Sequence, residues 1–299
     1  MNTVTKVLPP TVMKIIKDNI MDLQNIDEIR LRVDRPLEFV CKGKSILCGY
    51  TVNKNDARFI LGKISQHSIY MLEEEMKKGY VTIEGGHRVG LAGKVITEDG
   101  MVKRIREVSS FNIRIAKQKV GCSIELIPKL IEGSALQNTI LVGPPQSGKT
   151  TMLRDIARNL SLGNKYLNGL RVGIVDERSE IAGSLDGIPQ FDLGPRIDIL
   201  DSCPKAEGMM MMIRSMSPEV LIVDEIGSER DANALVEAVH AGVKIIVTAH
   251  GYNYSDVFNR PYFRKVLDEK IFSRFVIMNL ENGPGTIEKV VESNGLQLV

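Results

Sequence analysis

The residues best suited to do chemistry form a glycine-rich run that ends in a lysine and two threonines. In chain order they are Gly143, Pro144, Pro145, Gln146, Ser147, Gly148, Lys149, Thr150 and Thr151. The first eight have the G-x-x-x-x-G-K-T spacing of a phosphate-binding loop, whose glycines let backbone N–H groups curl around an anion. In such a loop Lys149 contacts the β- and γ-phosphates of a nucleotide, and Thr150 ligates Mg²⁺. We therefore expect a nucleoside triphosphate to bind here.

The flanking sequence supplies the strand and the helix that a phosphate-binding loop needs. Residues 140–142 are apolar and lead directly into Gly143. Residues 151–160 have helical spacing and place one set of apolar side chains on one face: Leu153, Ile156, Ala157 and Leu160. The helix amino terminus adds partial positive charge beside the loop. A glycine turn with a chance lysine would not have this context.

An acidic pair, Asp224 and Glu225, follows the apolar strand expected over residues 220–223. In open parallel sheets, ligands bind at the carboxyl ends of the strands, so both side chains are expected to face the nucleotide. Asp224 would hold Mg²⁺ through water, and Glu225 would polarise the attacking water. The alternative is a solvated loop that begins with two carboxylates.

Two other apolar runs end in polar residues. Residues 170–175 lead into an acidic segment that contains Glu177 and Glu180, and residues 243–247 lead towards His250. If the strands are parallel, these side chains reach the same sheet edge as the phosphate loop. We expect a catalytic role for Glu177 and a γ-phosphate-sensing role for His250. A solvated acidic loop and an ordinary loop histidine are the alternatives.

These motifs must be positioned by strands that alternate with helices. Continuous apolar strands separated by helices are typical of a parallel sheet that is covered on both faces. The sequence therefore predicts an α/β fold over residues 137–299, namely a RecA-like P-loop domain with a mainly parallel sheet. Residues 274–279 and 286–291 flank a Gly-Pro-Gly turn, which predicts a closing hairpin.

The first part of the chain has a different pattern. Residues 1–115 contain short strand-like runs and a helical stretch over 55–76, which predicts a smaller α+β domain. Residues 116–136 are expected to form a linker with a short helix over 123–131. This division agrees with the length of 299 residues, since a domain has roughly 150 residues.

Composition limits the classes of function. The formal net charge is only +2, and no apolar run approaches the ~18 residues of a membrane-spanning helix, so any membrane association is expected to be peripheral. The cysteines show no metal-binding spacing and are expected to be free thiols in a reducing cytosol. They are Cys41, Cys48, Cys122 and Cys203.

The order of these motifs resembles that of the ATPases of type II and type IV secretion systems, which work as ring-shaped hexamers. The finer detail resembles one branch of that superfamily, the stage III sporulation protein AA family. The stretches that carry this resemblance cover residues 28–32, 143–151, 175–183, 201–208, 215–227 and 248–251. By position, Glu177 and Glu180 fall in the acidic box, Glu225 matches the Walker B glutamate, and His250 falls in the histidine box.

The resemblance also implies a cellular role. It implies a homo-hexameric, Mg²⁺-dependent ATPase in the mother-cell cytoplasm, peripheral at the membrane. This ATPase would energise a membrane-embedded channel complex between mother cell and forespore during sporulation. The preference for ATP over GTP rests on the resemblance alone. In the wider superfamily, arginines of the N-terminal domain and linker reach the nucleotide, and the candidates here are Arg30, Arg32 and Arg114. Surface salt bridges are the alternative for these arginines.

Two other functions fit a phosphate-binding loop. A RecA-like motor stimulated by nucleic acid is poorly supported, because the chain is nearly neutral and only 5% aromatic. A nucleotide-gated scaffold without hydrolysis would keep Lys149 but would have no use for Glu225. Stimulation by single-stranded nucleic acid separates the first alternative, and nucleotide binding without turnover separates the second.

Overall fold

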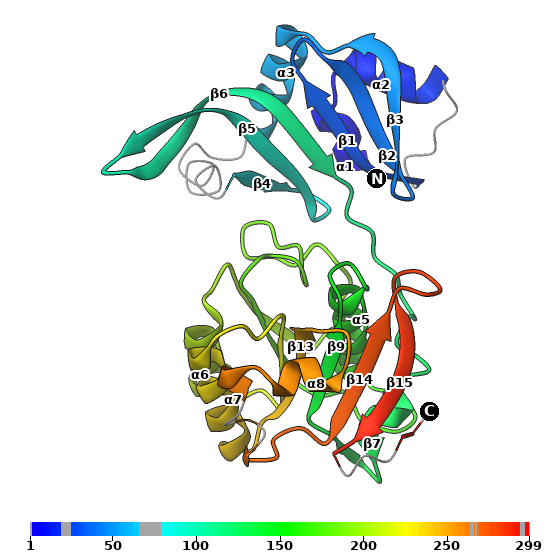
Figure 1. The fold of residues 1–299 in the computed structure, drawn as a ribbon, viewed down its shortest axis with the longest axis vertical. Coiled ribbons are helices and arrows are strands. Elements are labelled where there is room, and N and C mark those ends of the chain that lie inside the picture. Colours follow the sequence, from blue (N-terminus) through cyan, green and yellow to red (C-terminus); the bar gives the residue numbers. More distant parts are fainter. Residues whose placement is uncertain are drawn as a thin grey trace. The chain divides into compact units, whose positions relative to one another are not determined.

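In the computed structural model the chain folds into two compact units (Figure 1). The structure describes residues 2–18, 25–65, 79–263, 266, 268–293 and 297–298. The N-terminal unit comprises Met1–Lys117 and Gly183–Gln190, and the C-terminal unit comprises Gln118–Ala182 and Phe191–Val299. The chain therefore leaves the C-terminal unit once, for residues 183–190, and then returns to it.

The N-terminal unit is an antiparallel sheet with helices. Its strand order is β3-β2-β1-β6-β5-β4. The strands are β1 (Ile26–Arg32), β2 (Pro36–Cys41), β3 (Lys44–Thr51), β4 (Tyr80–Ile83), β5 (His87–Glu98) and β6 (Met101–Arg114). The helices are α1 (Asn2–Val7), α2 (Pro10–Asp18) and α3 (Lys54–Ile64). Apolar side chains of the helices and of the sheet form one buried core.

Helix α3 covers the first half of the helical stretch predicted over 55–76. It begins at a capping box, in which the Asn53 side chain accepts the N–H of Asp56 and the Asp56 side chain accepts the N–H of Asn53. The rest of that prediction, from residue 66 onward, lies outside the described residues.

The outer parts of β5 and β6 extend as a two-stranded arm, visible in Figure 1. Residues 93–98 pair with residues 101–108, whereas β1 and β4 pair with the inner parts of these strands. Within the described residues, no helix is long and apolar enough to span a bilayer.

The C-terminal unit has a seven-stranded sheet in the order β11-β10-β12-β13-β9-β14-β15. The strands are β9 (Thr139–Gly143), β10 (Val172–Asp176), β11 (Ile197–Asp201), β12 (Val220–Val223), β13 (Lys244–His250), β14 (Arg274–Asn279) and β15 (Thr286–Glu292). Every neighbouring pair is parallel except β14 and β15, which form an antiparallel hairpin. The predicted α/β fold with a mainly parallel sheet and a closing hairpin is therefore confirmed.

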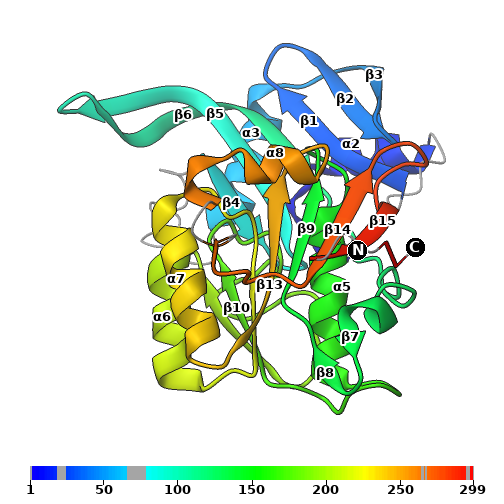
Figure 2. The same cartoon turned by 60° about the horizontal axis from the view of Figure 1, so that its bottom comes forward.

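Helices cover this sheet on both faces. Their bounds are α5 (Lys149–Leu162), α6 (Lys205–Met216), α7 (Glu229–His240) and α8 (Tyr254–Phe258). Alternate residues of β12 belong to different cores. Ile222 lies in the core that contains the apolar face of α5, whereas Leu221 and Val223 lie in the core that contains residues of α6 and α7. Helices α6 and α7 lie side by side in Figure 2. Burial on both faces explains why these strands are apolar throughout.

The helix expected over 123–131 is only a short 3₁₀ helix, η3 (Ile127–Leu130). It is followed by a small hairpin of β7 (Ile131–Glu132) and β8 (Ala135–Leu136). The start of this stretch is anchored by the buried carboxylate of Asp155 on α5, which accepts the backbone N–H groups of Gly121 and Ser123 at 2.9 and 2.7 Å.

Candidate active site

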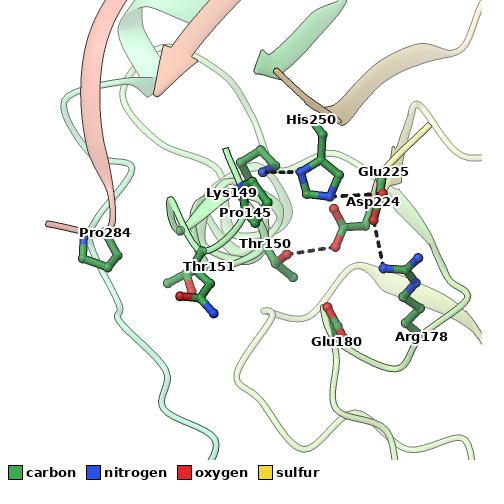
Figure 3. Close-up of a pocket in the computed structure, with 12 residues that line it drawn as sticks. Pro145, Lys149, Thr150, Thr151, Arg178, Glu180, Asp224, Glu225, His250 and Pro284 are labelled. Atoms are coloured by element: carbon green, nitrogen blue, oxygen red, sulfur yellow. Dashed lines mark hydrogen bonds and ion pairs between the residues drawn. The ribbon is translucent and has the colours of Figure 1, made fainter. Parts of the chain in front are cut away.

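A cavity of about 380 Å³ opens at the carboxyl-terminal edge of the parallel sheet (Figure 3). Its walls come from the phosphate-binding loop after β9, from the loops after β10 and β12, from His250 at the end of β13, and from the turn between β14 and β15. Parallel strands end at the same edge, so residues far apart in the sequence meet there. This shared edge brings together the polar strand ends that the sequence singled out.

The phosphate-binding loop joins β9 to α5 through two left-handed residues. Gln146 has φ +65° and Gly148 has φ +89°, and Gly148 is the residue that precedes the helix. A Cβ atom at Gly148 would lie 2.7 Å from the backbone nitrogen of Gly285. Glycine is required here for its backbone angle and because another backbone lies against it.

That second backbone is the turn between β14 and β15. The N–H of Gly285 donates to the carbonyl oxygen of Ser147 at 2.8 Å, and Pro284 lines the cavity. The sequence identified the Gly-Pro-Gly run as a hairpin turn and contained no signal that it lies against the phosphate-binding loop.

The ammonium group of Lys149 is buried at the base of the loop. It donates to the carbonyl oxygens of Gly143 and Pro144, both at 2.8 Å, and lies 3.3 Å from Nδ1 of His250. Burial lowers the pKa of Lys149, while the carboxylates of Asp224 and Glu225 oppose this shift. Each of the three N–H donors of the ammonium therefore has an acceptor at the base of the loop.

His250 connects Lys149 to the acidic residues. An ammonium group can only donate, so Nδ1 of His250 is the acceptor and the ring proton lies on Nε2. Nε2 is 3.1 Å from Oε1 of Glu225, to which it donates. Figure 3 shows these side chains in a row, with Arg178 following Glu225. His250 thus fixes one oxygen of the predicted catalytic base.

The two predicted metal ligands lie together. The hydroxyl of Thr150 donates to Oδ2 of Asp224 at 2.9 Å. On the other side, the hydroxyl of Thr248 donates to Oδ1 of Asp224 and accepts the backbone N–H of Glu225 at 2.7 Å. Glu225 itself has φ +46°, a left-handed turn directly after β12. One threonine therefore positions both acidic residues.

The donor atoms at this place suit Mg²⁺ bound with a nucleotide. Mg²⁺ prefers oxygen ligands, keeps several waters, and binds through one or two protein groups together with substrate phosphates. The Thr150 hydroxyl and the Asp224 carboxylate provide such groups. Within the described residues, no cluster of three or more His, Cys, Asp or Glu side chains could hold a metal by itself. The Thr150 hydroxyl and the Asp224 carboxylate therefore suit a Mg²⁺ ion that binds together with a nucleotide.

The acidic loop after β10 is held by two buried charged residues. Asp176 accepts the backbone N–H groups of Glu180, Ile181 and Ala182 at 2.8, 3.0 and 2.8 Å. Arg154 on α5 donates to the carbonyl oxygens of Glu180 and Ile181 at 2.7 and 2.6 Å. Burial raises the pKa of Asp176 to about 6, against the lowering effect of these N–H groups. The loop has a fixed course beside the cavity.

Of the two glutamates that the sequence singled out in this loop, one reaches the cavity. Glu180 lines the cavity, whereas Glu177 pairs with Lys205 at the start of α6. Arg178 also lines the cavity and donates to Oε2 of Glu225 at 2.9 Å. Sequence reasoning missed Arg178, although its place between two acidic residues of the box was a usable signal.

The three candidate trans-acting arginines lie in the N-terminal unit. Arg30 and Arg114 both contact Glu28, at 2.6 and 3.2 Å, and Arg32 contacts Glu38 at 2.6 Å. All three side chains are more than one third exposed. Their role towards the nucleotide of a neighbouring subunit stays a prediction.

Comparisons of sequence identify relatives over the whole chain. The family described as "Sporulation stage III, protein AA" matches residues 1–298. Stage III sporulation protein AA from Bacillus subtilis (strain 168) is 53% identical over 297 residues, which are 99% of this chain and 96% of that protein.

Comparisons of structure give the same fold in more distant proteins. The ATPase DotB of Legionella pneumophila aligns with a TM-score of 0.62 and 15% identity, over 90% of this chain and 76% of its own. The pilus retraction motor PilT with bound ADP aligns with a TM-score of 0.60 and 15% identity, over 89% and 77%. The mixed α/β fold is therefore shared with these proteins.

Proposed function

The chain belongs to the family described as Sporulation stage III, protein AA, and from this premise we propose that it is a Mg²⁺-dependent ATPase that drives a ring-shaped motor. One observation carries the proposal. A phosphate-binding loop, a threonine–aspartate pair suited to Mg²⁺, and a glutamate held by a histidine line one cavity. The fold likeness to an ATPase and to a pilus retraction motor supports a RecA-like motor domain.

Each residue has a defined task in the proposed hydrolysis. The backbone N–H groups of residues 143–151 and the ammonium of Lys149 bind the β- and γ-phosphates. Mg²⁺ bound to Thr150 and Asp224 would neutralise charge on these phosphates. Glu225 orients a water towards the γ-phosphate and accepts its proton, while His250 holds the carboxylate in place.

The motor is proposed to act as a homo-hexamer at a membrane. We place it in the mother-cell cytoplasm, peripheral at the membrane, where it energises a membrane-embedded channel complex to the forespore. The family and the Bacillus subtilis relative support the sporulation context. Arg30, Arg32 and Arg114 would reach the nucleotide of the next subunit, which would make hydrolysis depend on the ring.

Two substitutions test hydrolysis directly. Lys149→Ala removes the phosphate ligand and is expected to abolish both nucleotide binding and phosphate release. Glu225→Gln removes the base but keeps the side-chain shape, so it should retain binding and lose about 100-fold or more in turnover. Phosphate release and equilibrium nucleotide binding are the measurements.

Glu219→Gln is the matched control. Glu219 is a half-exposed glutamate just before β12, paired with Arg171 and outside the cavity lining, so turnover should not change. Wild-type turnover in both test variants would contradict the proposed ATPase. Tight ATP binding by the wild type without phosphate release, with partners present, would favour a nucleotide-gated scaffold.

A further inference from the structure

The guanidinium of Arg178 lies at the wall of the cavity and contacts the proposed catalytic base. Its Nη1 donates to Oε2 of Glu225 at 2.9 Å, while Nε2 of His250 donates to Oε1 at 3.1 Å. Both carboxylate oxygens of Glu225 therefore have a cationic or polar partner (Figure 3). The Arg178 side chain is 60% exposed, whereas that of Glu225 is 28% exposed. The guanidinium is thus the accessible member of the pair.

The position of Arg178 puts it within reach of a terminal phosphate. A general base lies within hydrogen-bond reach of the water that attacks the phosphorus, so only one water separates Glu225 from the γ-phosphate. A group that contacts Glu225 from the cavity side is therefore close to the γ-phosphate oxygens. A guanidinium has five N–H donors, and the bond to Glu225 uses one of them.

The distribution of charge in the cavity favours this contact. Lys149 comes from the phosphate-binding loop, and Arg178 comes from the loop after β10, on a different side of Asp224 in Figure 3. During phosphoryl transfer, negative charge is spread over the γ-phosphate oxygens. Lys149 can neutralise this charge from one side only. The planar fork of an arginine suits phosphate oxygens in bidentate geometry.

We propose that Arg178 is a γ-phosphate ligand supplied by the same chain, and that it exchanges Glu225 for the terminal phosphate when a nucleoside triphosphate binds. This rests on the proposed function of the cavity. Once Arg178 has moved to the phosphate, Oε2 of Glu225 is available to the attacking water. A diphosphate offers no γ-phosphate, so with ADP the guanidinium stays on Glu225.

An exposed surface ion pair is the competing explanation for the Arg178 contact. Arg171 and Glu219 form such a pair at 3.5 Å, and the Arg171 side chain is also 60% exposed. Neither residue lines the cavity. Arg171→Ala is therefore a matched control, with the same charge change and the same exposure at a site that cannot contact the nucleotide.

Equilibrium binding of a non-hydrolysable ATP analogue and of ADP tests the proposal. Arg178→Ala should raise the Kd of the triphosphate about 10- to 100-fold, as expected for the loss of a charged hydrogen bond. The Kd of ADP should stay at the wild-type value, which also shows that the variant is folded. Arg178→Lys keeps the charge but loses the fork and should give an intermediate Kd. Arg171→Ala should change neither constant.

A second variant separates phosphate binding from a simple restraint on Glu225. In Glu225→Gln the guanidinium loses its anionic partner, so the triphosphate should bind more tightly than to the wild type. The added Arg178→Ala substitution should remove that gain. Equal losses for ATP analogue and ADP in Arg178→Ala, or no loss for either, would overturn the proposal.

The two hypotheses fail in different ways. Binding needs no turnover, so a wild-type protein that binds both nucleotides but releases no phosphate would contradict the proposed ATPase. The difference between triphosphate and diphosphate binding in Arg178→Ala would still be measurable in that case, and it alone decides the role of Arg178.

Discussion

At the scale of single residues, one row of contacts joins the phosphate-binding loop to the acidic loop. Lys149, His250, Glu225 and Arg178 each contact the next member of the row. The ammonium at one end fixes the tautomer of His250, and this in turn makes His250 a donor to Glu225. The orientation of the proposed base therefore depends on residues that are far apart in the sequence.

Asp176 gives a prediction of pH dependence at this scale. Burial raises the pKa of its carboxyl group from the ordinary 3.8 to about 6. Between these values the folded chain keeps the proton while the unfolded chain has lost it, so the free energy of unfolding falls as pH rises. The protonated carboxyl group of Asp176 contributes about 3 kcal/mol to the free energy of unfolding. This contribution is fully present below about pH 4 and is lost by about pH 6.5.

Urea unfolding of wild type and Asp176→Asn at both ends of this range measures that contribution. The stability advantage of the wild type over the variant should shrink as pH rises. Asp192→Asn is the control, because the hydrogen bond from Arg158 lowers the pKa of exposed Asp192 and moves its titration below the range. A wild-type advantage that stays constant or grows with pH would contradict the prediction.

At the scale of elements, the β14–β15 hairpin takes part in shaping the phosphate-binding loop. Its turn lies against Gly148, so the loop is held between its own helix and a hairpin from the end of the chain. The sheet order places β14 directly beside β9, which brings the turn after β14 to the loop after β9. The hairpin is therefore part of the proposed nucleotide site as well as the end of the sheet.

Gly148→Ala tests this packing. The added Cβ would meet the backbone of Gly285 at 2.7 Å and must displace the turn or the loop. We expect the nucleotide Kd to rise about ten-fold or more. The strain of an alanine in the left-handed conformation should also lower the free energy of unfolding by about 1–2 kcal/mol. Nucleotide binding and thermal unfolding are the measurements.

Gly283→Ala is the control for backbone strain. Gly283 has φ +92°, close to the +89° of Gly148, but a Cβ there would meet nothing within 4 Å. This variant should lose stability through strain and keep nucleotide affinity. Equal effects of the two substitutions on nucleotide affinity would mean that strain alone, without the close approach, explains the requirement for glycine.

At the scale of the whole molecule, the chain passes from one unit to the other and back beside the acidic loop. Residues 177–182 belong to the C-terminal unit, and residues 183–190 belong to the N-terminal unit. Within the N-terminal unit, the side chain of Gln190 accepts the N–H of Gly85 at 2.9 Å. The acidic loop is therefore continuous in the chain with a segment that belongs to the N-terminal unit.

The proposed ring predicts complementation between inactive chains. Lys149→Ala leaves the N-terminal arginines intact, and a variant with alanine at Arg30, Arg32 and Arg114 leaves the cavity intact. Each variant alone should be inactive. If the arginines act on the next subunit, mixed rings contain some complete sites, and phosphate release should partly recover on mixing.

Two controls accompany this experiment. A mixture of Lys149→Ala with Glu225→Gln should recover no activity, because both defects lie in one cavity. Sedimentation with a non-hydrolysable ATP analogue should show a species near six times the 33.2 kDa of one chain. A persistent monomer, or no recovery in the first mixture, would contradict arginines that act between subunits.

The sequence by itself determined the parallel sheet, the phosphate-binding loop and the strand ends that carry Asp224, Glu225 and His250. This was possible because these features are local: an apolar run defines a buried strand, and parallel strands deliver their next residues to one edge. The apolar face of α5 was likewise predictable from helical spacing, and its members are buried.

Only the tertiary structure decided which neighbouring residues reach the cavity and which do not. Arg178 contacts Glu225, whereas Glu177 turns to Lys205, although the two are adjacent in the chain. Pro284 lines the cavity because β14 lies beside β9, and residues 183–190 belong to the N-terminal unit. These outcomes depend on partners that are distant in sequence, and local patterns of hydrophobicity and turns do not encode such partners.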